Sequence, residues 1–267
     1  MNRITQKFNE IKETGRNGLV VFITAGAPDI EATYATIPAL VSGGADIIEI
    51  GMPFSDPLAE GLVIQQSSFL SLQNNTTVDD CLDLVVNVRK TDKLTPLVLM
   101  GYYNPVYQYG SEKFVKKCNE YGIDGLIIVD LPAVEAQEFK QICNKSDVSF
   151  IPLIAPTSTD KNISLSLEKC DGFVYCVSVT GVTGARTEVS SRGLDLVDRI
   201  KKFTDLPVAV GFGVSNKSHI DEICLKAEAA VVGSALVKVM LESDKCNIAK
   251  NAGDFVKSLT GHSEKID

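Results

Sequence analysis

The sequence lacks several features that would assign it to a class at once. Among its 267 residues, no apolar run reaches the roughly 18 residues that a membrane-spanning helix requires. The amino end, MNRITQKFNEIKETG, has no apolar segment of the kind found in a secretory signal peptide. Positive charge is not in excess, because the net charge is −8 and the pI is about 4.9. We therefore expect neither a membrane segment nor a nucleic-acid partner.

The cysteines and histidines indicate neither a disulfide framework nor a metal site. The seven cysteines include no C-x-x-C pair, and an odd number without paired spacing indicates reduced thiols in a cytoplasmic protein. Only two histidines occur, His219 and His262, and neither follows an apolar run that could be a strand. This argues against a zinc aldolase and against a histidine-based proton relay.

The apolar residues form short, β-branched runs that recur along the chain. The runs are apolar throughout rather than alternating, which is typical of parallel strands buried on both faces. A length of 267 residues with 45% hydrophobic content predicts one domain over residues 1–267. The predicted strands are Leu19–Thr24, Asp46–Gly51, Pro96–Gly101, Gly125–Val129, Ser149–Ile154, Gly172–Val177, Pro207–Gly211 and Ala229–Val232.

Helical spacing fills the segments between these runs. Cys81, Leu84 and Val88 fall on one helical face, and Thr77 stands where an N-cap belongs. Eight strand–helix units predict an α/β fold, the (β/α)8 TIM barrel, here with an extra N-terminal helix. The alternative is a doubly wound open sheet, which would carry G-x-G-x-x-G after its first strand. Thr24–Pro28 lacks that pattern, so the barrel is favoured.

In such a barrel, catalytic groups come from the carboxyl ends of the strands. Glu49 lies inside a predicted strand between isoleucines, where a carboxylate is costly to bury. Burial raises a carboxyl pKa and prepares it for general acid–base catalysis near neutral pH. The alternative is a structural ion pair inside the barrel.

Loops after the strands offer further candidates. The loop Met52–Gly61 carries Asp56 and Glu60, either as site or partner-contact residues or as solvated surface charges. The glycine- and threonine-rich segment Ser178–Arg186 suits a loop that closes over a ligand. Glycines at Gly211-Phe212-Gly213 and Gly233-Ser234 suit a phosphate site, or only tight turns.

No predicted strand contains a lysine, which argues against a Schiff-base aldolase. Carboxylate acid–base chemistry on a small phosphorylated substrate remains. A phosphate-binding isomerase would need a different acid–base pair, such as Cys176 with an aspartate.

One segment carries a family resemblance. Asp46–Gln65 reads DIIEIGMPFSDPLAEGLVIQ and resembles the signature of tryptophan synthase α subunits. Phe22–Gly26, Leu99–Pro105, Gly181–Arg186 and Val210–Val214 agree with that family in order and spacing. The resemblance implies a carbon–carbon lyase of tryptophan biosynthesis, which cleaves indole-3-glycerol phosphate into indole and glyceraldehyde 3-phosphate. It also implies an αββα heterotetramer, in which indole passes to the β subunit.

The resemblance assigns roles to the two glutamates. Glu49 resembles the general acid that protonates indole C3 and then takes the proton of the glycerol C3′ hydroxyl. Glu60 stands where the family has an aspartate that stabilises charge on the indole nitrogen, and Leu62 replaces a proline. One extra methylene displaces a carboxylate by about an ångström, enough to cost roughly 10²-fold in rate. The alternative function is therefore an impaired α-type subunit that binds ligand and activates the β subunit.

The same correspondence implies the remaining site residues. Asp56 and Pro57 resemble the edge that meets the β subunit. That partner carries the pyridoxal phosphate, and no cofactor is expected in this chain. The residues expected to bind substrate are Phe22, Leu99, Tyr102, Leu126 or Ile127, and Tyr175 around the indole, Thr183 beside the catalytic glutamate, Gly184, Gly213, Gly233 and Ser234 around the phosphate, and also Phe212.

Overall fold

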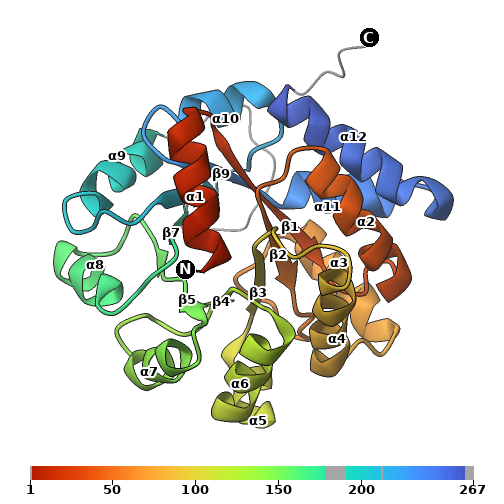
Figure 1. Cartoon of the computed structure of the whole chain (residues 1–267), viewed down its shortest axis with the longest axis horizontal. Helices are drawn as coiled ribbons and strands as arrows, with labels where there is room; N and C mark the ends of the chain where they lie inside the picture. The colour runs from red at the N-terminus through yellow and green to blue at the C-terminus, as the bar shows by residue number, and fades with distance from the viewer. Residues whose placement is uncertain (1, 178–190, 212, 262–267) are drawn as a thin grey trace.

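The computed structural model describes residues 2–177, 191–211 and 213–261. Strands occupy the centre of the molecule and helices surround them (Figure 1). All strand pairs are parallel, in the order β5-β4-β3-β2-β1-β9-β8-β7-β6. The strands are β1 Gly18–Thr24, β2 Ile47–Gly51, β3 Leu97–Gly101, β4 Gly125–Ile128, β5 Ser149–Phe150, β6 Leu153–Ile154, β7 Val174–Val177, β8 Val208–Gly211 and β9 Ala229–Val232.

The sheet closes through the predicted strand Ser149–Ile154. This segment is divided into β5 and β6, because Pro152 has no N–H to donate to a ladder. The Ile151 N–H donates to the Leu126 carbonyl of β4, and the Pro152 carbonyl accepts from the Tyr175 N–H of β7. One segment thus joins the two ends of the sheet, and the predicted (β/α)8 barrel is confirmed.

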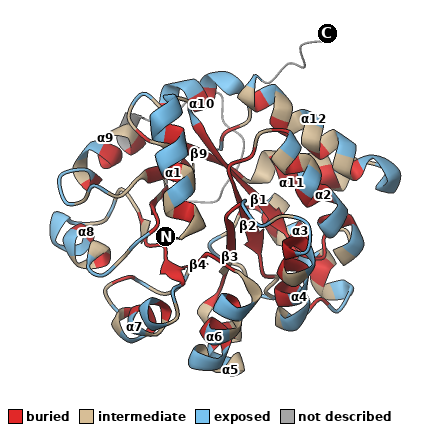
Figure 2. Cartoon of the chain, in the orientation of Figure 1, coloured by how far each residue is buried: buried red, intermediate tan, exposed pale blue. Residues whose placement is uncertain are grey.

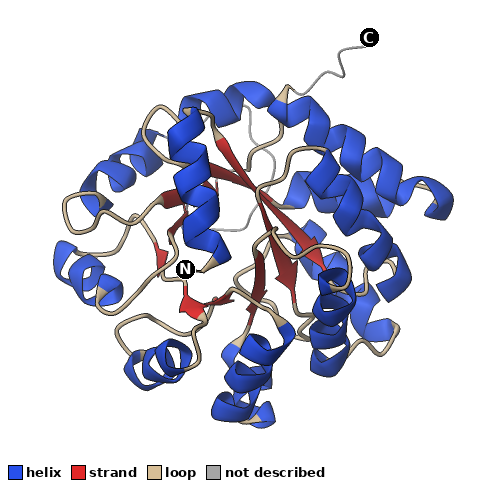
Figure 3. Cartoon of the chain, in the orientation of Figure 1, coloured by secondary structure: helices blue, strands red, loops and turns tan. Residues whose placement is uncertain are grey.

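Helices follow the strands around the outside of the barrel (Figure 3). The expected N-cap at Thr77 is present as a capping box with Asp80. The helices are α1 Arg3–Thr14, α2 Ile30–Ser42, α3 Leu62–Gln73, α4 Val78–Arg89, α5 Tyr103–Tyr109, α6 Ser111–Tyr121, α7 Gln137–Lys145, α8 Asp160–Leu167, α9 Ser191–Ile200, α10 Lys217–Ile223, α11 Ser234–Glu242, the 3-10 helix η1 Lys245–Asn247 and α12 Ile248–Thr260.

Two apolar layers hold the barrel together, and alternate strand residues belong to each. The outer layer packs strand residues such as Ile48, Leu99 and Cys176 against the helices. The inner layer fills the barrel with residues such as Val98 and Ile127. The strands are accordingly buried along their length, whereas the surrounding helices are exposed on one side (Figure 2).

Helix α1 closes the end of the barrel at which the strands begin. Its residues Ile4, Phe8 and Ile11 are buried with the inner layer, and α1 lies across the strands in Figure 1. The predicted N-terminal helix is therefore part of the barrel core. Because it blocks this end, a ligand that reaches the inner layer must enter from the other end, where the strands finish.

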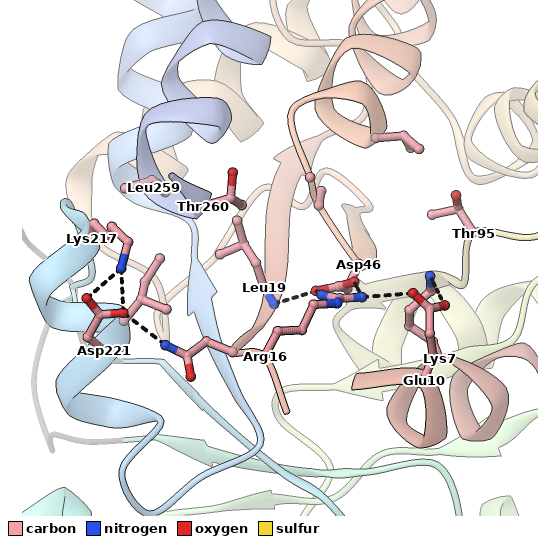
Figure 4. Close-up of a pocket in the computed structure, with 15 residues that line it drawn as sticks. Lys7, Glu10, Arg16, Leu19, Asp46, Thr95, Lys217, Asp221, Leu259 and Thr260 are labelled. Atoms are coloured by element: carbon pink, nitrogen blue, oxygen red, sulfur yellow. Dashed lines mark hydrogen bonds and ion pairs between the residues drawn. The ribbon is translucent and has the colours of Figure 1, made fainter. Parts of the chain in front are cut away.

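Buried carboxylates fix the strands at the closed end. Asp46, just before β2, accepts the Leu19 N–H of β1 and two bonds from Arg16. Asp124, just before β4, likewise accepts the Leu97 N–H of β3. Figure 4 shows the Arg16–Asp46 pair in a cavity of about 460 Å³ at this end. Its charged side chains are bonded to one another, which indicates a structural role.

Candidate active site

Glu49 lies in the middle of β2 and faces the barrel interior, two residues after the inner-layer Ile47. Its side chain is fully buried, and neither carboxyl oxygen has a hydrogen-bond partner among the described residues. Burial, and then the charge of Glu60, raises the pKa of Glu49 to about 8. The group is therefore mostly protonated at neutral pH and can donate a proton to a bound molecule.

Glu60 ends the loop between β2 and α3 and is partly buried. Burial raises the pKa of Glu60 to about 7. Desolvation, followed by the charges of Glu49 and Glu60, raises the pKa of Tyr175 well above its ordinary value. The three side chains thus share one poorly solvated space at the open end of the barrel.

An apolar cleft lies beside Glu49 and Glu60. Tyr102, which follows β3, stacks on Phe54 with ring centroids 4.8 Å apart and accepts the Ala59 N–H at 3.1 Å. Burial raises the pKa of Tyr102 to about 12, so it stays a neutral phenol. The cleft is lined by Phe22, Thr24, Gly51, Met52, Phe54, Pro57, Glu60, Ile64, Ser68, Met100, Gly101 and Tyr102. The open volume of this cleft is about 20 Å³ among the described residues, and its lining is of the apolar, aromatic kind that contacts flat rings.

Leu99 is not brought to this cleft. It is fully buried in the outer layer against the helices, and the adjacent Met100 lines the cleft in its place. Side chains alternate along a strand, so the interpretation of Leu99 was wrong by one residue. The same alternation decides between the two candidates on β4: Leu126 is in the outer layer and Ile127 is in the inner layer.

Three of the residues expected to bind phosphate follow two neighbouring strands: Gly213 comes after β8, and Gly233 and Ser234 come after β9. Gly233 is the N-cap of α11, and a Cβ there would lie 3.6 Å from the Phe22 Cβ, so this helix begins beside the cleft. Gly213 is exposed with a φ of +65°, which favours glycine. The expected ligand residues Thr183, Gly184 and Phe212 lie outside the described residues.

Cys176, the alternative acid–base group, is not at this site, and neither is His219, which the sequence had argued against. Cys176 points to the outer layer, and burial raises its pKa to about 12, which argues against its use as an acid–base group. His219 lies on α10, where the Asn216 side chain caps the helix and contacts the histidine ring. In the part of the chain that the structure describes, no three His, Cys, Asp or Glu side chains are grouped to hold a metal ion.

The remaining predicted contacts lie at the rim. Asp56 is exposed and Pro57 is partly buried, and the next residue, Leu58, is 87% exposed.

Of the helices described, none is both long and apolar enough to cross a membrane. Met100 was not among the predicted site residues, and neither were the side chains of α3 that contact the loop that ends at Glu60. Ser68 gave no signal in the sequence, because a serine on a helix is more often exposed than buried.

Comparisons with known proteins agree over nearly the whole chain. A family model described as tryptophan synthase alpha chain matches residues 8–264. The tryptophan synthase alpha chain of Geobacter sulfurreducens is 44% identical over 259 residues, which are 97% of this chain and 98% of that protein. The alpha chain of Caldanaerobacter subterraneus is 42% identical over 260 residues, again 97% and 98% of the two chains.

Solved structures give the same result. The tryptophan synthase alpha chain of Legionella pneumophila superposes with a TM-score of 0.89 at 32% identity, over 98% of this chain and 97% of that one. A chain of the tryptophan synthase complex from Pyrococcus furiosus superposes with a TM-score of 0.85 at 36% identity, over 91% and 98% of the two chains.

Proposed function

The chain belongs to the tryptophan synthase alpha chain family, and we propose that Glu49 and Glu60 are its catalytic residues. The protein is a carbon–carbon lyase of tryptophan synthesis, which cleaves indole-3-glycerol phosphate into indole and glyceraldehyde 3-phosphate. The observation that carries the assignment is the fully buried Glu49 carboxyl, whose oxygens have no hydrogen-bond partner among the described residues. A structural ion pair, the alternative for this residue, would need such a partner.

The reaction transfers protons and breaks one carbon–carbon bond, with no oxidation or reduction. Protonated Glu49 delivers its proton to indole C3, which gives an indolenine. The bond between indole C3 and the glycerol carbon then breaks in a retro-aldol step, as the Glu49 carboxylate takes the proton of the C3′ hydroxyl. The electron pair of the broken carbon–carbon bond returns to the indole ring. The Glu60 carboxylate stabilises the positive charge on the indole nitrogen while the ring is protonated.

We place the substrate at this cleft because of the residues that line it. Phe22, Met100 and Tyr102 cover the indole ring, with Ile127 and Tyr175 from the inner layer. The phosphate binds where α11 begins, because a helix N-terminus presents free N–H groups and a positive dipole. The residues proposed for the phosphate are Gly184, Gly213, Gly233 and Ser234, with Thr183 and Phe212 completing the site.

The chain acts with the tryptophan synthase β subunit, and we place Asp56 and Pro57 at that contact. Leu58, the next residue in the same loop, is exposed and supports an interface there. The αββα stoichiometry, and indole transfer within it, rest on the family. The cleavage forms no amino-acid carbanion, which is the species that pyridoxal phosphate stabilises, so that cofactor is assigned to the β subunit alone. The seven free cysteines support a cytoplasmic location.

Family membership favours the lyase over the regulatory alternative. Indole formation by wild type and Glu49→Gln, with and without a β subunit, tests the assignment. Glutamine should fold and bind glycerol phosphate, but cleavage should fall by at least about 10²-fold. A Gln variant that keeps half of the wild-type rate would remove Glu49 from the mechanism. Very slow wild-type cleavage even with the β subunit, with activation of that subunit intact, would support the regulatory alternative.

A further inference from the structure

Helix α3 carries an unusual row of polar side chains on its buried face. Ser67, Ser68 and Ser71 are at most 4% exposed. The Ser71 hydroxyl donates to the Ala25 carbonyl, in the loop after β1. The helix therefore packs onto the open end of the barrel through hydrogen bonds as well as through apolar contacts.

Ser68 holds the start of the Glu60 loop. Its hydroxyl accepts the Phe54 N–H at 2.8 Å and donates to the Phe54 carbonyl at 3.0 Å. Both polar groups of one loop residue are thus satisfied by a single side chain. Phe54 in turn stacks on Tyr102, whose hydroxyl accepts the Ala59 N–H. The backbone is fixed at Phe54 and again at Ala59, next to the catalytic residue.

Gln65 holds the other end of the same loop. Its side-chain amide donates to the Glu60 carbonyl at 2.9 Å, one turn into α3 from the loop. This bond acts on the residue that carries the carboxylate. The Glu60 backbone thus has a direct restraint from Gln65 and an indirect one from Ser68.

We propose that Ser68 and Gln65 are positioning residues for the Glu60 carboxylate: α3 holds the loop 53–60 at both ends so that Glu60 faces the indole nitrogen. The inference rests on the proposed catalytic role of Glu60. Ser68 lines the cleft, but its hydroxyl is bonded to the Phe54 backbone, and Gln65 is not part of the cleft lining. Their effect on rate arises because a displacement of about 1 Å in a catalytic group can cost on the order of 10²-fold.

The first test compares two serines on the same helix. Ser68→Ala releases Phe54, whereas Ser71→Ala removes an equally buried hydroxyl that bonds to another loop. We expect Ser68→Ala to lower kcat by about tenfold or more, with KM within about twofold of wild type because indole and phosphate contacts remain. Ser71→Ala should keep wild-type kcat. Equal losses of kcat in the two variants would overturn the inference, since they would report helix packing only.

The pH profile gives a readout that a packing defect would not move. Release of the loop lets water reach Glu60, so its pKa should fall from about 7 towards the ordinary 4.5. Rate is lost as pH falls through this pKa, so the acid limb of kcat should move to lower pH in Ser68→Ala. An unchanged acid limb in a variant with reduced kcat would contradict the inference.

A double-mutant cycle separates this inference from the proposed function. Ser68→Ala should slow wild type but add nothing to Glu60→Ala, because its effect passes through the missing carboxylate. If Ser68→Ala slows both backgrounds equally, the inference fails while the role of Glu60 stands. If Glu60→Ala alone cleaves at the wild-type rate, the proposed role of Glu60 fails, and the inference fails with it.

Gln65→Met provides a second variant if Ser68→Ala does not fold. Methionine keeps the length of the side chain but loses the donor to the Glu60 carbonyl. The control is Gln66→Met, on the adjacent exposed position of α3. We expect the same fall in kcat at unchanged KM for Gln65→Met, and wild-type kinetics for Gln66→Met. Wild-type kcat in Gln65→Met would overturn the role of Gln65.

Discussion

Replacing Glu49 with glutamine should make the protein more stable at neutral pH while it slows cleavage. Burial raises the pKa of Glu49 from 4.5 to about 8, so the folded protein keeps a proton that the unfolded chain has lost. This difference in protonation opposes folding at every pH above 4.5. Glutamine has nearly the same shape as the protonated acid and cannot ionise, so it removes the cost.

The magnitude follows from the two pKa values. The contribution of Glu49 to the free energy of unfolding is highest below pH 4.5, where Glu49 is protonated in both the folded and the unfolded state. It falls until about pH 8, where Glu49 also ionises in the folded state. Each pH unit in this window costs about 1.4 kcal/mol, so the carboxyl costs about 3 kcal/mol at pH 7 and less than about 1 kcal/mol at pH 5. The stability gain of Glu49→Gln should grow with pH by this amount.

Urea unfolding at pH 5, 6 and 7, followed by circular dichroism, measures the gain. Glu222→Gln is the matched control, because Glu222 is exposed on α10. It should change stability by less than about 0.5 kcal/mol at each pH. A Glu49→Gln variant that is less stable than wild type at pH 7, or whose difference from wild type does not grow with pH, would refute the reasoning. Glu49 would then not be held protonated in the fold.

Substitutions at three other positions test the site and its scaffold. Glu60→Ala should nearly abolish indole formation and Glu60→Asp should preserve or improve it; rapid cleavage by the alanine variant would move the role to another carboxylate. Gly213→Val should raise KM by tenfold or more, on the order of a few kcal/mol of binding, with little change in kcat, because a side chain blocks the approach of backbone N–H groups to the phosphate; an unchanged KM would place the phosphate elsewhere. Asp124→Asn should lower the free energy of unfolding by about 3 kcal/mol, because Arg89 is left buried without its charge partner; urea unfolding within about 1 kcal/mol of wild type would contradict this role.

The barrel could be predicted because its strands are buried on both faces. Every predicted strand is present, with ends shifted by one or two residues and one run divided at Pro152. The same uniform burial explains the error at Leu99. The first four residues of Leu97–Gly101 all have apolar side chains, so nothing in the sequence indicates which of these side chains face the barrel interior. Only the register with neighbouring strands places Met100 in the cleft.

Glu49 could be predicted because a carboxylate stands out in an apolar strand, and Glu60 because the family resemblance pointed to it. The residues that position the Glu60 loop, Ser68 and Gln65, could not be predicted. Ser68 and Gln65 act through single hydrogen bonds to the backbone of a distant loop. Polar residues on a helix usually indicate its solvated face, so the sequence pattern of α3 disguises the face that packs on the barrel.

In the proposed mechanism, Glu49 and Glu60 have different roles although both are glutamates in a poorly solvated environment. Burial raises both pKa values, to about 8 for Glu49 and about 7 for Glu60. Between these values Glu49 keeps its proton while Glu60 has lost its own, which matches an acid with a charge-stabilising carboxylate. The ionised Glu60 also raises the pKa of Glu49. On the proposed roles, a loop held in place by α3 serves both steps, because the same negative charge would face the indole nitrogen and keep the proton on Glu49.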